Sequence, residues 1–343
     1  MLTFSASDLT AFTTRVFQAV GAPTPVARLV AEALVDSNLV GHDSHGVIRI
    51  PQYLRDKAEG HVVPDAEPAV VHATPAVAVV DGHWAFGQVS AQFALEQAMQ
   101  RARQLGIGAA GLRHAWHVGR LGEYAERAAN EGLVTHILCN SVAARVVPFG
   151  GREGRFATNP LAWGIPIPGR PPVVLDFATS VVAEGKVRLA YTAGKSIPEG
   201  WIIDAEGQPS TNPADLYTGG ALLPFGGYKG SGLALVVDLV GALMVGMGAP
   251  TLPDSTFGNG MVIIALDPAA FGNAEGFARD AAVLAERVKD CPPAPGFDGI
   301  MLPGEPEAAT RAQRLANGVP IAEGTWATIL EATRSVGVEF EAQ

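Results

Sequence analysis

The spacing of apolar residues predicts helices at both ends of the chain, with strands and helices alternating between them. Apolar side chains recur at helical spacing after Ser5 and again after Thr24-Pro25, until Gly41 ends the second helix. The same spacing predicts further helices over 51–58, 88–104, 118–129, 178–189, 233–247 and 274–289, and in a last region that holds Leu315 and Trp326.

Short apolar runs bounded by turn residues predict the strands. A small hairpin is expected over 69–80, around Thr74-Pro75. Other strands are expected over 107–112, 133–139, 173–175 and 260–266. The stretch 140–172 is rich in glycine, proline and small residues, and long loops of this kind are usually functional. The sequence therefore predicts an α/β core that carries helices from both termini.

One glycine run matches a dinucleotide-binding pattern by letter only. Gly106 to Gly111 spell G-x-G-x-x-G, but that fingerprint needs a strand before it and a helix that begins within it. Here a helix precedes the run, Gly106 is the predicted end of that helix, and 107–112 is a predicted strand. We therefore expect no Rossmann unit at this position.

Composition narrows the classes of protein that remain. The 343 residues include 24 Lys and Arg against 34 Asp and Glu, a net charge of −10, which argues against a nucleic-acid or anionic-membrane partner. Cys139 and Cys291 are too few for a disulfide framework, so we expect two buried thiols and a reducing compartment. The N-terminus does not show the pattern of a secretory signal, which favours a cytoplasmic location. The apolar stretch 233–250 falls short of the roughly 20 residues that a membrane span needs, which favours a buried helix.

The densest group of chemically active side chains is the run 41–49, Gly-His-Asp-Ser-His-Gly-Val-Ile-Arg, between two predicted helices. Histidine exchanges protons near neutral pH, because its unperturbed pKa is about 6.5, and Asp43 and Ser44 stand beside His45 to orient it. Arg49 offers a planar guanidinium suited to a carboxylate. The alternative is a helix end, where polar residues gather because the chain turns. We interpret the run as a catalytic corner, called the 41–49 corner below.

The histidine pattern leaves alternatives open. Two H-x-x-H pairs, His42 with His45 and His114 with His117, raise the question of a metal site. Zinc sites use a further protein ligand and usually a helix that sets the spacing, so we expect no metal. Of the second pair, we expect His117 to contact a ligand, with packing as the alternative. Ser44 beside His45 does not favour a serine hydrolase, because no G-x-S-x-G elbow occurs.

Three other features have both a functional and a structural interpretation. The glycines of 226–232 surround Lys229 before an apolar helix, and they suit either a phosphate group or a surface turn. Trp116 either adds bulk beside a ligand or packs in the core. Glu123 and Glu126 fall on one helical face, which is typical of a solvated surface.

Six motifs in the chain resemble, in the same order, those of the malate/L-lactate/sulfolactate dehydrogenase superfamily, which is unrelated in fold to the Rossmann-type lactate dehydrogenases. They cover nearly the whole chain. They are G-H-D-S-H-G-V at 41–47, T-N-P at 158–160, L-D-F-A-T-S at 175–180 with Gly185-Lys186, I-P-E-G-W at 197–201, G-G-Y-K-G at 226–230 and L-P-G-E at 302–305. The run H-A-W-H-V-G-R-L-G at 114–122 is most similar to the branch called hydroxycarboxylate dehydrogenase B.

The resemblance implies a homodimer that transfers a hydride reversibly between NAD or NADP and a small 2-oxo acid or cyclic imino acid. It also implies a mixed, largely antiparallel sheet flanked by helices, without a Rossmann fingerprint. His45 is then the proton donor and acceptor with Ser44 as its relay partner, while Arg49, Thr158 and His117 are the expected substrate contacts. The residues expected to line the cofactor are Gly119, Arg120, Leu121, Val174, Leu175, Asp176, Phe177, Ala178, Thr179, Ser180, Tyr228, Lys229, Gly230, Asn259, Gly304, Glu305, Pro306 and Glu307.

Three domains are expected on this basis. Residues 1–86 form a helical part with the 41–49 corner, 87–302 form the α/β cofactor-binding core, and 303–343 supply helices that pack back on the first part.

One departure from the resemblance bears on the substrate. The branch that reduces cyclic imino acids carries histidine and aspartate where this chain has Glu184 and Lys186, and that aspartate serves as a third relay member. Lys186 cannot take this role, which favours a 2-hydroxy acid dehydrogenase over a cyclic imino acid reductase and makes Asp43 the nearest candidate to orient His45. Outside the family, the alternatives are a metal-dependent hydrolase and a cofactor-binding protein without turnover.

Overall fold

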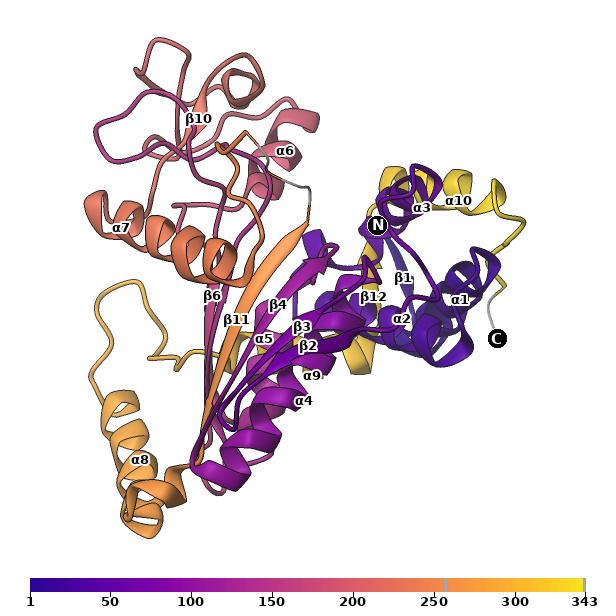
Figure 1. Ribbon diagram of the computed structural model, residues 1–343. Coiled ribbons are helices and arrows are strands. Elements are labelled where there is room, and N and C mark those ends of the chain that lie inside the picture. The colour runs from indigo at the N-terminus through magenta and orange to yellow at the C-terminus, as the bar shows by residue number, and fades with distance from the viewer. Residues whose placement is uncertain (254, 256–257, 342–343) are drawn as a thin grey trace.

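The computed structural model describes residues 1–253, 255 and 258–341, and within these residues a seven-stranded sheet forms the centre of the molecule (Figure 1). Only β3 and β4 pair in parallel, and the other neighbours pair antiparallel. In sheet order, the strands are β2 (Ala69–Ala73), β3 (Val77–Asp81), β4 (Ile107–Ala115), β11 (Asn259–Leu266), β5 (Val134–Cys139), β6 (Leu161–Ile165) and β7 (Val173–Phe177).

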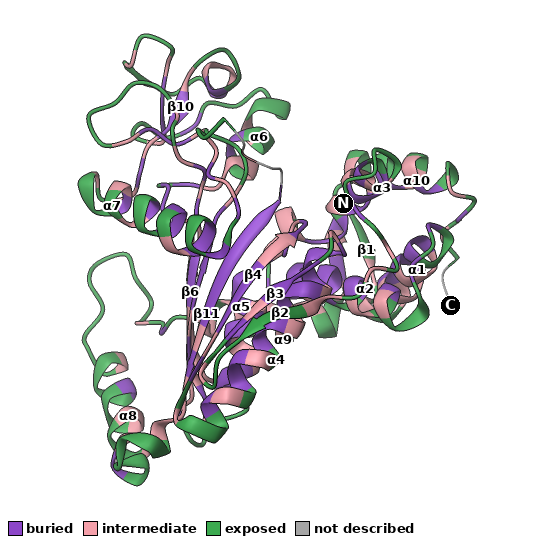
Figure 2. Cartoon of the chain, in the orientation of Figure 1, coloured by how far each residue is buried: buried purple, intermediate pink, exposed green. Residues whose placement is uncertain are grey.

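Alternation along the central strands distributes apolar side chains to both faces of the sheet. Ile137 packs with α4 (Gly87–Leu105) and α5 (Leu121–Asn130) in the largest core of the sheet. Its neighbour Leu138 faces the other way and packs with Val237, which follows α7 (Tyr228–Val236). Successive side chains on a strand point to opposite faces, so β5 is buried on both sides, as Figure 2 shows for the centre of the sheet.

Both ends of the chain build one helical region beside the sheet. It contains α1 (Ala6–Ala19), α2 (Thr24–Leu39), α3 (Ile50–Ala58), α9 (Glu305–Asn317) and α10 (Glu323–Arg334). Strand β1 (Leu2–Phe4) pairs antiparallel with β12 (Val319–Ile321). Phe12 of α1 packs 5.6 Å from the ring of Trp326 of α10. Strand β12 and helix α10 therefore complete the apolar core that the N-terminal helices begin.

The third region lies at the far end of β6 and β11 (Figure 1). Its small sheet has β8 (Ile202–Ile203) between β9 (Pro209–Ser210) and β10 (Ala221–Leu222), and α6 (Glu184–Thr192) packs beside it through Val187. Helix α8 (Ala274–Lys289) follows β11 and contacts the loop before β7 through Ala285. The mixed, largely antiparallel sheet flanked by helices confirms the expected fold class.

Most predicted elements are present, and Gly106 ends α4 with a left-handed φ of 84° before β4, so the rejection of a Rossmann unit is confirmed. Within the described residues, six strands were not expected, namely β6 within the glycine- and proline-rich stretch, β1 and β12 near the two ends of the chain, and the short strands β8, β9 and β10 of the third region. The helix predicted from Ala178 begins only at Glu184, because Thr179 N–H donates to Thr158 O across the chain. Cys139 is buried as expected, but the expectation is wrong for Cys291, which is exposed.

The apolar stretch after the glycine run begins as α7 and continues through a π-helical turn, Val237–Ala242, to Val245. By length and composition alone, the helical stretch Tyr228–Val245 is apolar enough to cross a membrane, and 39% of it is buried inside the protein. The expectation of a buried helix is thus met only in part, since Leu239 is 49% exposed and Met244 65% exposed.

Candidate active site

Two consecutive 3-10 turns, Asp43–His45 and Val47–Arg49, shape the 41–49 corner. The buried Asn38 side chain holds them together, because its Oδ1 accepts Val47 N–H at 2.9 Å and its Nδ2 donates to Asp43 Oδ1 at 2.7 Å. A Cβ on Gly46 would overlap this amide. The corner therefore needs both the asparagine and the glycine.

His45 and Ser44 form a pair in the corner. The Ser44 Oγ lies 3.1 Å from His45 Nδ1, and Gly185 packs against Ser44, since a Cβ at Gly185 would stand 3.2 Å from Ser44 Cβ. Asp43 does not join this pair. Its carboxylate binds Asn38 and, at 2.6 Å, Arg314 Nη1. The expectation that Asp43 orients His45 finds no support in this geometry.

The corner opens on a cavity of about 300 Å³, called the corner cavity here, which is lined by Ser44, His45 and Arg49. Arg49 Nε donates to Ser44 O and its Nη1 to Gln52 Oε1, both at 2.6 Å. These contacts fix the guanidinium at the cavity wall, and the described residues include no partner for its second terminal nitrogen. That nitrogen is placed to bind an anionic group.

His117 brings a second imidazole to the corner cavity. Its ring stacks on the ring of His45, with centroids 5.6 Å apart and planes at 22°. Trp116 lines the same cavity and donates from Nε1 to the buried Asp56 at 2.7 Å. Trp116 therefore packs in the core and also lines the cavity, so both of its predicted roles hold.

Both imidazoles are electrically neutral in the free protein. Burial lowers the pKa of His45 to about 3, and the positive charge of Arg49 acts in the same direction. Burial, followed by Arg49, also holds the pKa of His117 well below its usual range. Desolvation and a nearby cation both disfavour the protonated ring. His45 thus stands ready to accept a proton.

A second cavity, of about 340 Å³, lies on the other side of the corner and is called the α9 cavity here. His42 of the corner lines it and contacts Glu307 Oε1 at 3.3 Å. Asp176 at the end of β7 accepts Gly122 N–H at 2.7 Å, and burial raises the pKa of its carboxyl. Arg120, only 4% exposed, stands in the same wall. Cationic and anionic side chains thus line one cavity.

The two cavities collect a little over half of the residues predicted for the site. The corner cavity contains Ser44, His45, Arg49, His117, Thr158 and Asn259. The α9 cavity contains Arg120, Val174, Leu175, Asp176, Gly304, Pro306 and Glu307.

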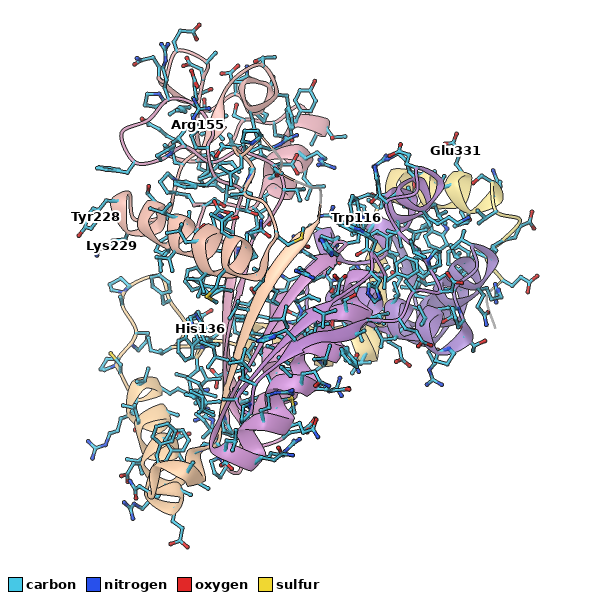
Figure 3. All side chains as sticks on the ribbon, viewed as in Figure 1. Trp116, His136, Arg155, Tyr228, Lys229 and Glu331 are labelled. Atoms are coloured by element: carbon cyan, nitrogen blue, oxygen red, sulfur yellow. The ribbon has the colours of Figure 1, made fainter. Side chains whose placement is uncertain are left out.

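The other predicted residues lie outside both cavities. Tyr228 and Lys229 project from the outer end of α7, far from Trp116 (Figure 3). Glu305 binds Lys289 at 2.7 Å and Arg170 at 2.9 Å, so its contacts in this chain join α9 to α8. The remaining members of this group are Asp43, Gly119, Leu121, Phe177, Ala178, Thr179, Ser180 and Gly230.

Sequence reasoning missed several cavity residues. Gln52, Arg145 and Arg188 line the corner cavity together with Glu184, which pairs with Arg188 at 2.8 Å. Lys186, by contrast, is exposed and lines neither cavity. Arg188 has a local signal in its i,i+4 spacing to Glu184, whereas Arg145 lies in the loop between β5 and β6 and only the fold brings it to Glu184.

The interpretation of Glu123 and Glu126 as a solvated surface is met only in part, because both side chains are half-buried. Burial and the negative charge of Asp36 raise the pKa of Glu123 to about 7. Glu126 pairs with Arg311 Nη2 at 3.3 Å, and both residues line the α9 cavity. The acidic face of α5 therefore borders that cavity through Glu126.

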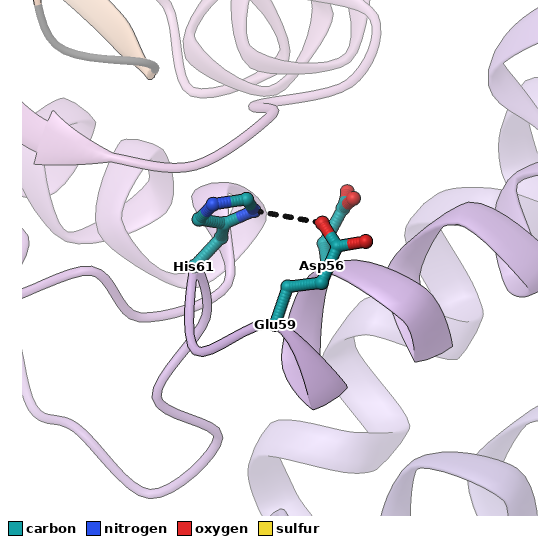
Figure 4. Close-up of side chains that lie close together, drawn as sticks. All are labelled: Asp56, Glu59 and His61. Carbon is teal, nitrogen blue, oxygen red and sulfur yellow. Dashed lines mark ion pairs between the residues drawn. The ribbon is translucent and has the colours of Figure 1, made fainter.

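Neither H-x-x-H pair forms a metal-binding group in the described part of the chain. His42 contacts Glu307, and His114 Nδ1 contacts Asp81 at 2.9 Å. Another set, Asp56, Glu59 and His61, brings its potential ligand atoms within 4.8 Å of one another (Figure 4). Asp56 already accepts the Trp116 N–H, and His61 lies 3.4 Å from Glu59.

Comparisons with known proteins agree with this fold. Hydroxycarboxylate dehydrogenase B of Escherichia coli K12 is 38% identical, over 98% of this chain and 95% of its own length. A Delta(1)-pyrroline-2-carboxylate reductase of Pseudomonas fluorescens is 34% identical, over 94% and 96%. The solved structure of a putative malate/lactate dehydrogenase from E. coli superposes with a TM-score of 0.93 at 36% identity, covering 99% of this chain and 96% of that one.

The fold and these relatives support a dehydrogenase of the 2-hydroxy acid class. The chain belongs to the malate/L-lactate dehydrogenase family, whose profile matches residues 4–330.

Proposed function

We propose that the protein is an NAD(P)-dependent dehydrogenase that interconverts a small 2-oxo acid and the matching 2-hydroxy acid. The observation that carries the proposal is the corner cavity, where a neutral imidazole and a fixed guanidinium stand on two consecutive turns. A 2-oxo acid offers a carboxylate to Arg49 and a carbonyl oxygen to His45.

The α9 cavity fits a nicotinamide dinucleotide. Gly304 has a left-handed φ of 94°, and a Cβ there would stand 3.2 Å from Val174 N, so glycine keeps the wall open. Arg120 is buried and its Nε has no partner among the described residues. A bound cofactor would be held by Arg120, Val174, Asp176 and Glu307, and it would supply or accept the hydride.

His45 exchanges the proton that accompanies the hydride. In hydroxy acid oxidation, the neutral ring takes the hydroxyl proton as a general base, and Ser44 at Nδ1 steadies the ring. In the reverse direction the ring must first be protonated. Burial is the main cause of the low pKa of His45 and the charge of Arg49 adds to it, so a substrate carboxylate on Arg49 offsets the second of these contributions. Binding of an anionic substrate therefore favours proton uptake at the group that donates it.

We assign a homodimeric state and a cytoplasmic location to the same proposal. The support is the resemblance of the sequence, its acidic composition with two cysteines, and the exposed apolar residues of the 228–245 stretch. Sedimentation velocity on the purified protein tests the dimer, and a monomer at micromolar concentration would contradict it.

The second candidate function is reduction of cyclic imino acids. It is favoured by the relative that carries that activity in its name. It is disfavoured by Lys186, because a lysine stands where the resemblance places an acidic relay member. The Lys186 side chain is also exposed.

The test is to follow NADH and NADPH oxidation against a panel of 2-oxo acids and cyclic imines, with and without a chelator. Reduction of a 2-oxo acid that survives chelation supports the proposal. Turnover of imines alone, or cofactor binding without turnover, contradicts it, and so does metal-dependent hydrolysis without a nicotinamide requirement. The His45→Ala variant should lose about 10²–10⁴-fold in turnover while it still binds cofactor, because a positioned acid–base group contributes that much.

A further inference from the structure

A buried polar chain links α4 to the corner cavity through α3. Gln88 of α4 and Tyr53 of α3 are each 1% exposed. Gln88 Nε2 donates to Tyr53 Oη at 2.7 Å, and Tyr53 Oη lies 2.7 Å from His117 Nδ1. Polar groups so deeply buried are costly unless they are hydrogen-bonded.

The direction of these bonds follows from the number of protons available. Burial raises the pKa of Tyr53, so its hydroxyl keeps its single proton. Because the Gln88 amide donates to that hydroxyl, the hydroxyl proton must point elsewhere. Two atoms of His117 can accept the hydroxyl proton of Tyr53. They are Nδ1 at 2.7 Å and the backbone carbonyl oxygen at 3.4 Å.

The state of His117 follows from the same count. Its lowered pKa means that the ring carries one proton in the free protein. If Nδ1 accepts from Tyr53, that proton resides on Nε2, the ring nitrogen that remains for the cavity. The neutral imidazole has one donor and one acceptor nitrogen, and the partner of one fixes the role of the other.

We infer that Gln88 and Tyr53 are positioning residues that hold His117 as a neutral Nε2–H donor to the substrate. The His117 ring stacks on that of His45, so both serve the same part of the cavity. A donor complements the carbonyl oxygen of a 2-oxo acid. It opposes the N–H of the iminium form of a cyclic imino acid. The chain Gln88–Tyr53–His117 therefore selects 2-oxo acids over cyclic imines, an inference that rests on the proposed function.

The first measurement needs no turnover. Selective ¹⁵N labelling of the 8 histidines, with His117→Gln to assign the resonance, distinguishes the two neutral tautomers in long-range ¹H–¹⁵N spectra. We expect the Nε2–H tautomer for His117 in the wild-type protein. The Nδ1–H tautomer would overturn the inference, because Tyr53 would then accept from His117 and the Gln88 amide would have the opposite orientation.

The second measurement uses Tyr53→Phe, which removes the donor to Nδ1 and leaves the ring. In this variant we expect a mixture of His117 tautomers. We also expect kcat/KM for a 2-oxo acid to fall about tenfold or more, the factor expected for the loss of one hydrogen bond to a group that is charged or gains charge in the reaction. The kcat/KM for a cyclic imine should not fall. Tyr124→Phe is the matched control, because its buried hydroxyl donates to Val118 O instead of to a cavity residue.

The two failures are distinguishable. Equal losses on both substrates, or unchanged tautomers in a folded Tyr53→Phe protein, overturn the inference and leave the dehydrogenase activity intact. If the wild-type tautomer is as expected but no 2-oxo acid is reduced, the proposed function fails, and with it the selection of 2-oxo acids. Should Tyr53→Phe not fold, the wild-type spectrum alone still decides the tautomer.

Discussion

The low pKa of His45 predicts a specific loss of stability in mild acid. The unfolded chain binds a proton at His45 with a pKa of 6.5, whereas the folded protein does so only near about 3. Between these values the unfolded state holds more protons, so the free energy of unfolding falls as the pH falls. Above about pH 7 both states are neutral at this residue, and the effect vanishes.

The size of the effect follows from the two pKa values. Going from pH 7 to pH 5, His45 alone lowers the free energy of unfolding by about 2 kcal/mol, because each pKa unit corresponds to about 1.4 kcal/mol. His117 acts in the same direction. The quantity to compare is therefore the pH dependence of the wild-type protein minus that of His45→Gln, which keeps a polar side chain but cannot titrate.

The assay is urea unfolding at pH 7 and pH 5, at one protein concentration, with the slope of the transition checked for constancy. We expect His45→Gln to lose about 2 kcal/mol less than the wild-type protein over this range. An equal loss in both proteins would refute the reasoning, since it would show that His45 titrates in the folded state as it does in the unfolded chain.

Three further predictions test the corner. Arg49→Lys should raise KM for a 2-oxo acid about 10- to 100-fold with a smaller change in kcat, because the planar fork is lost; initial-rate kinetics measure the split, and an unchanged KM would contradict it. Asp43→Asn should keep kcat within a few-fold of the wild-type value, because the Asp43 carboxylate binds Arg314 and not His45; a 100-fold fall in kcat would show that Asp43 takes part in proton transfer with Ser44 and His45. Gly46→Ala should lower the free energy of unfolding by about 2–4 kcal/mol, because the new methyl displaces the Asn38 amide; denaturant unfolding measures it, and a loss below 1 kcal/mol would speak against that contact.

The sequence predicts the 41–49 corner well, because its contacts are mostly local. The helix that ends at Gly41, the turn residues and the Ser44–His45 pair all lie within a few positions of one another. The ion pair between Asp43 and Arg314 could not be predicted, because the two residues are 271 positions apart in the chain. Only the packing of α9 on α2 brings them together.

Two errors in the predicted elements have one cause, since tertiary hydrogen bonds decided the local structure. Strand β6 lies among turn residues, yet it pairs with β5 on one side and β7 on the other, which outweighs the local composition. The segment after β7 has the pattern of a helix start, but Ser180 bridges to Pro224 and Thr179 bonds to Thr158. Helix α6 begins only after these bonds are made.

Helix α9 contacts both the α9 cavity and the 41–49 corner. Its N-terminal turn presents Gly304 and Glu307 to the α9 cavity, and Arg311 of the next turns pairs with Asp36 of α2. Further along, Arg314 binds both the Asp43 carboxylate and, at 2.5 Å, the carbonyl of Asn38. Asn38 is the residue whose side chain folds the corner. Because one helix lines the α9 cavity at one end and binds the 41–49 corner at the other, a shift of α9 changes the α9 cavity and the corner together.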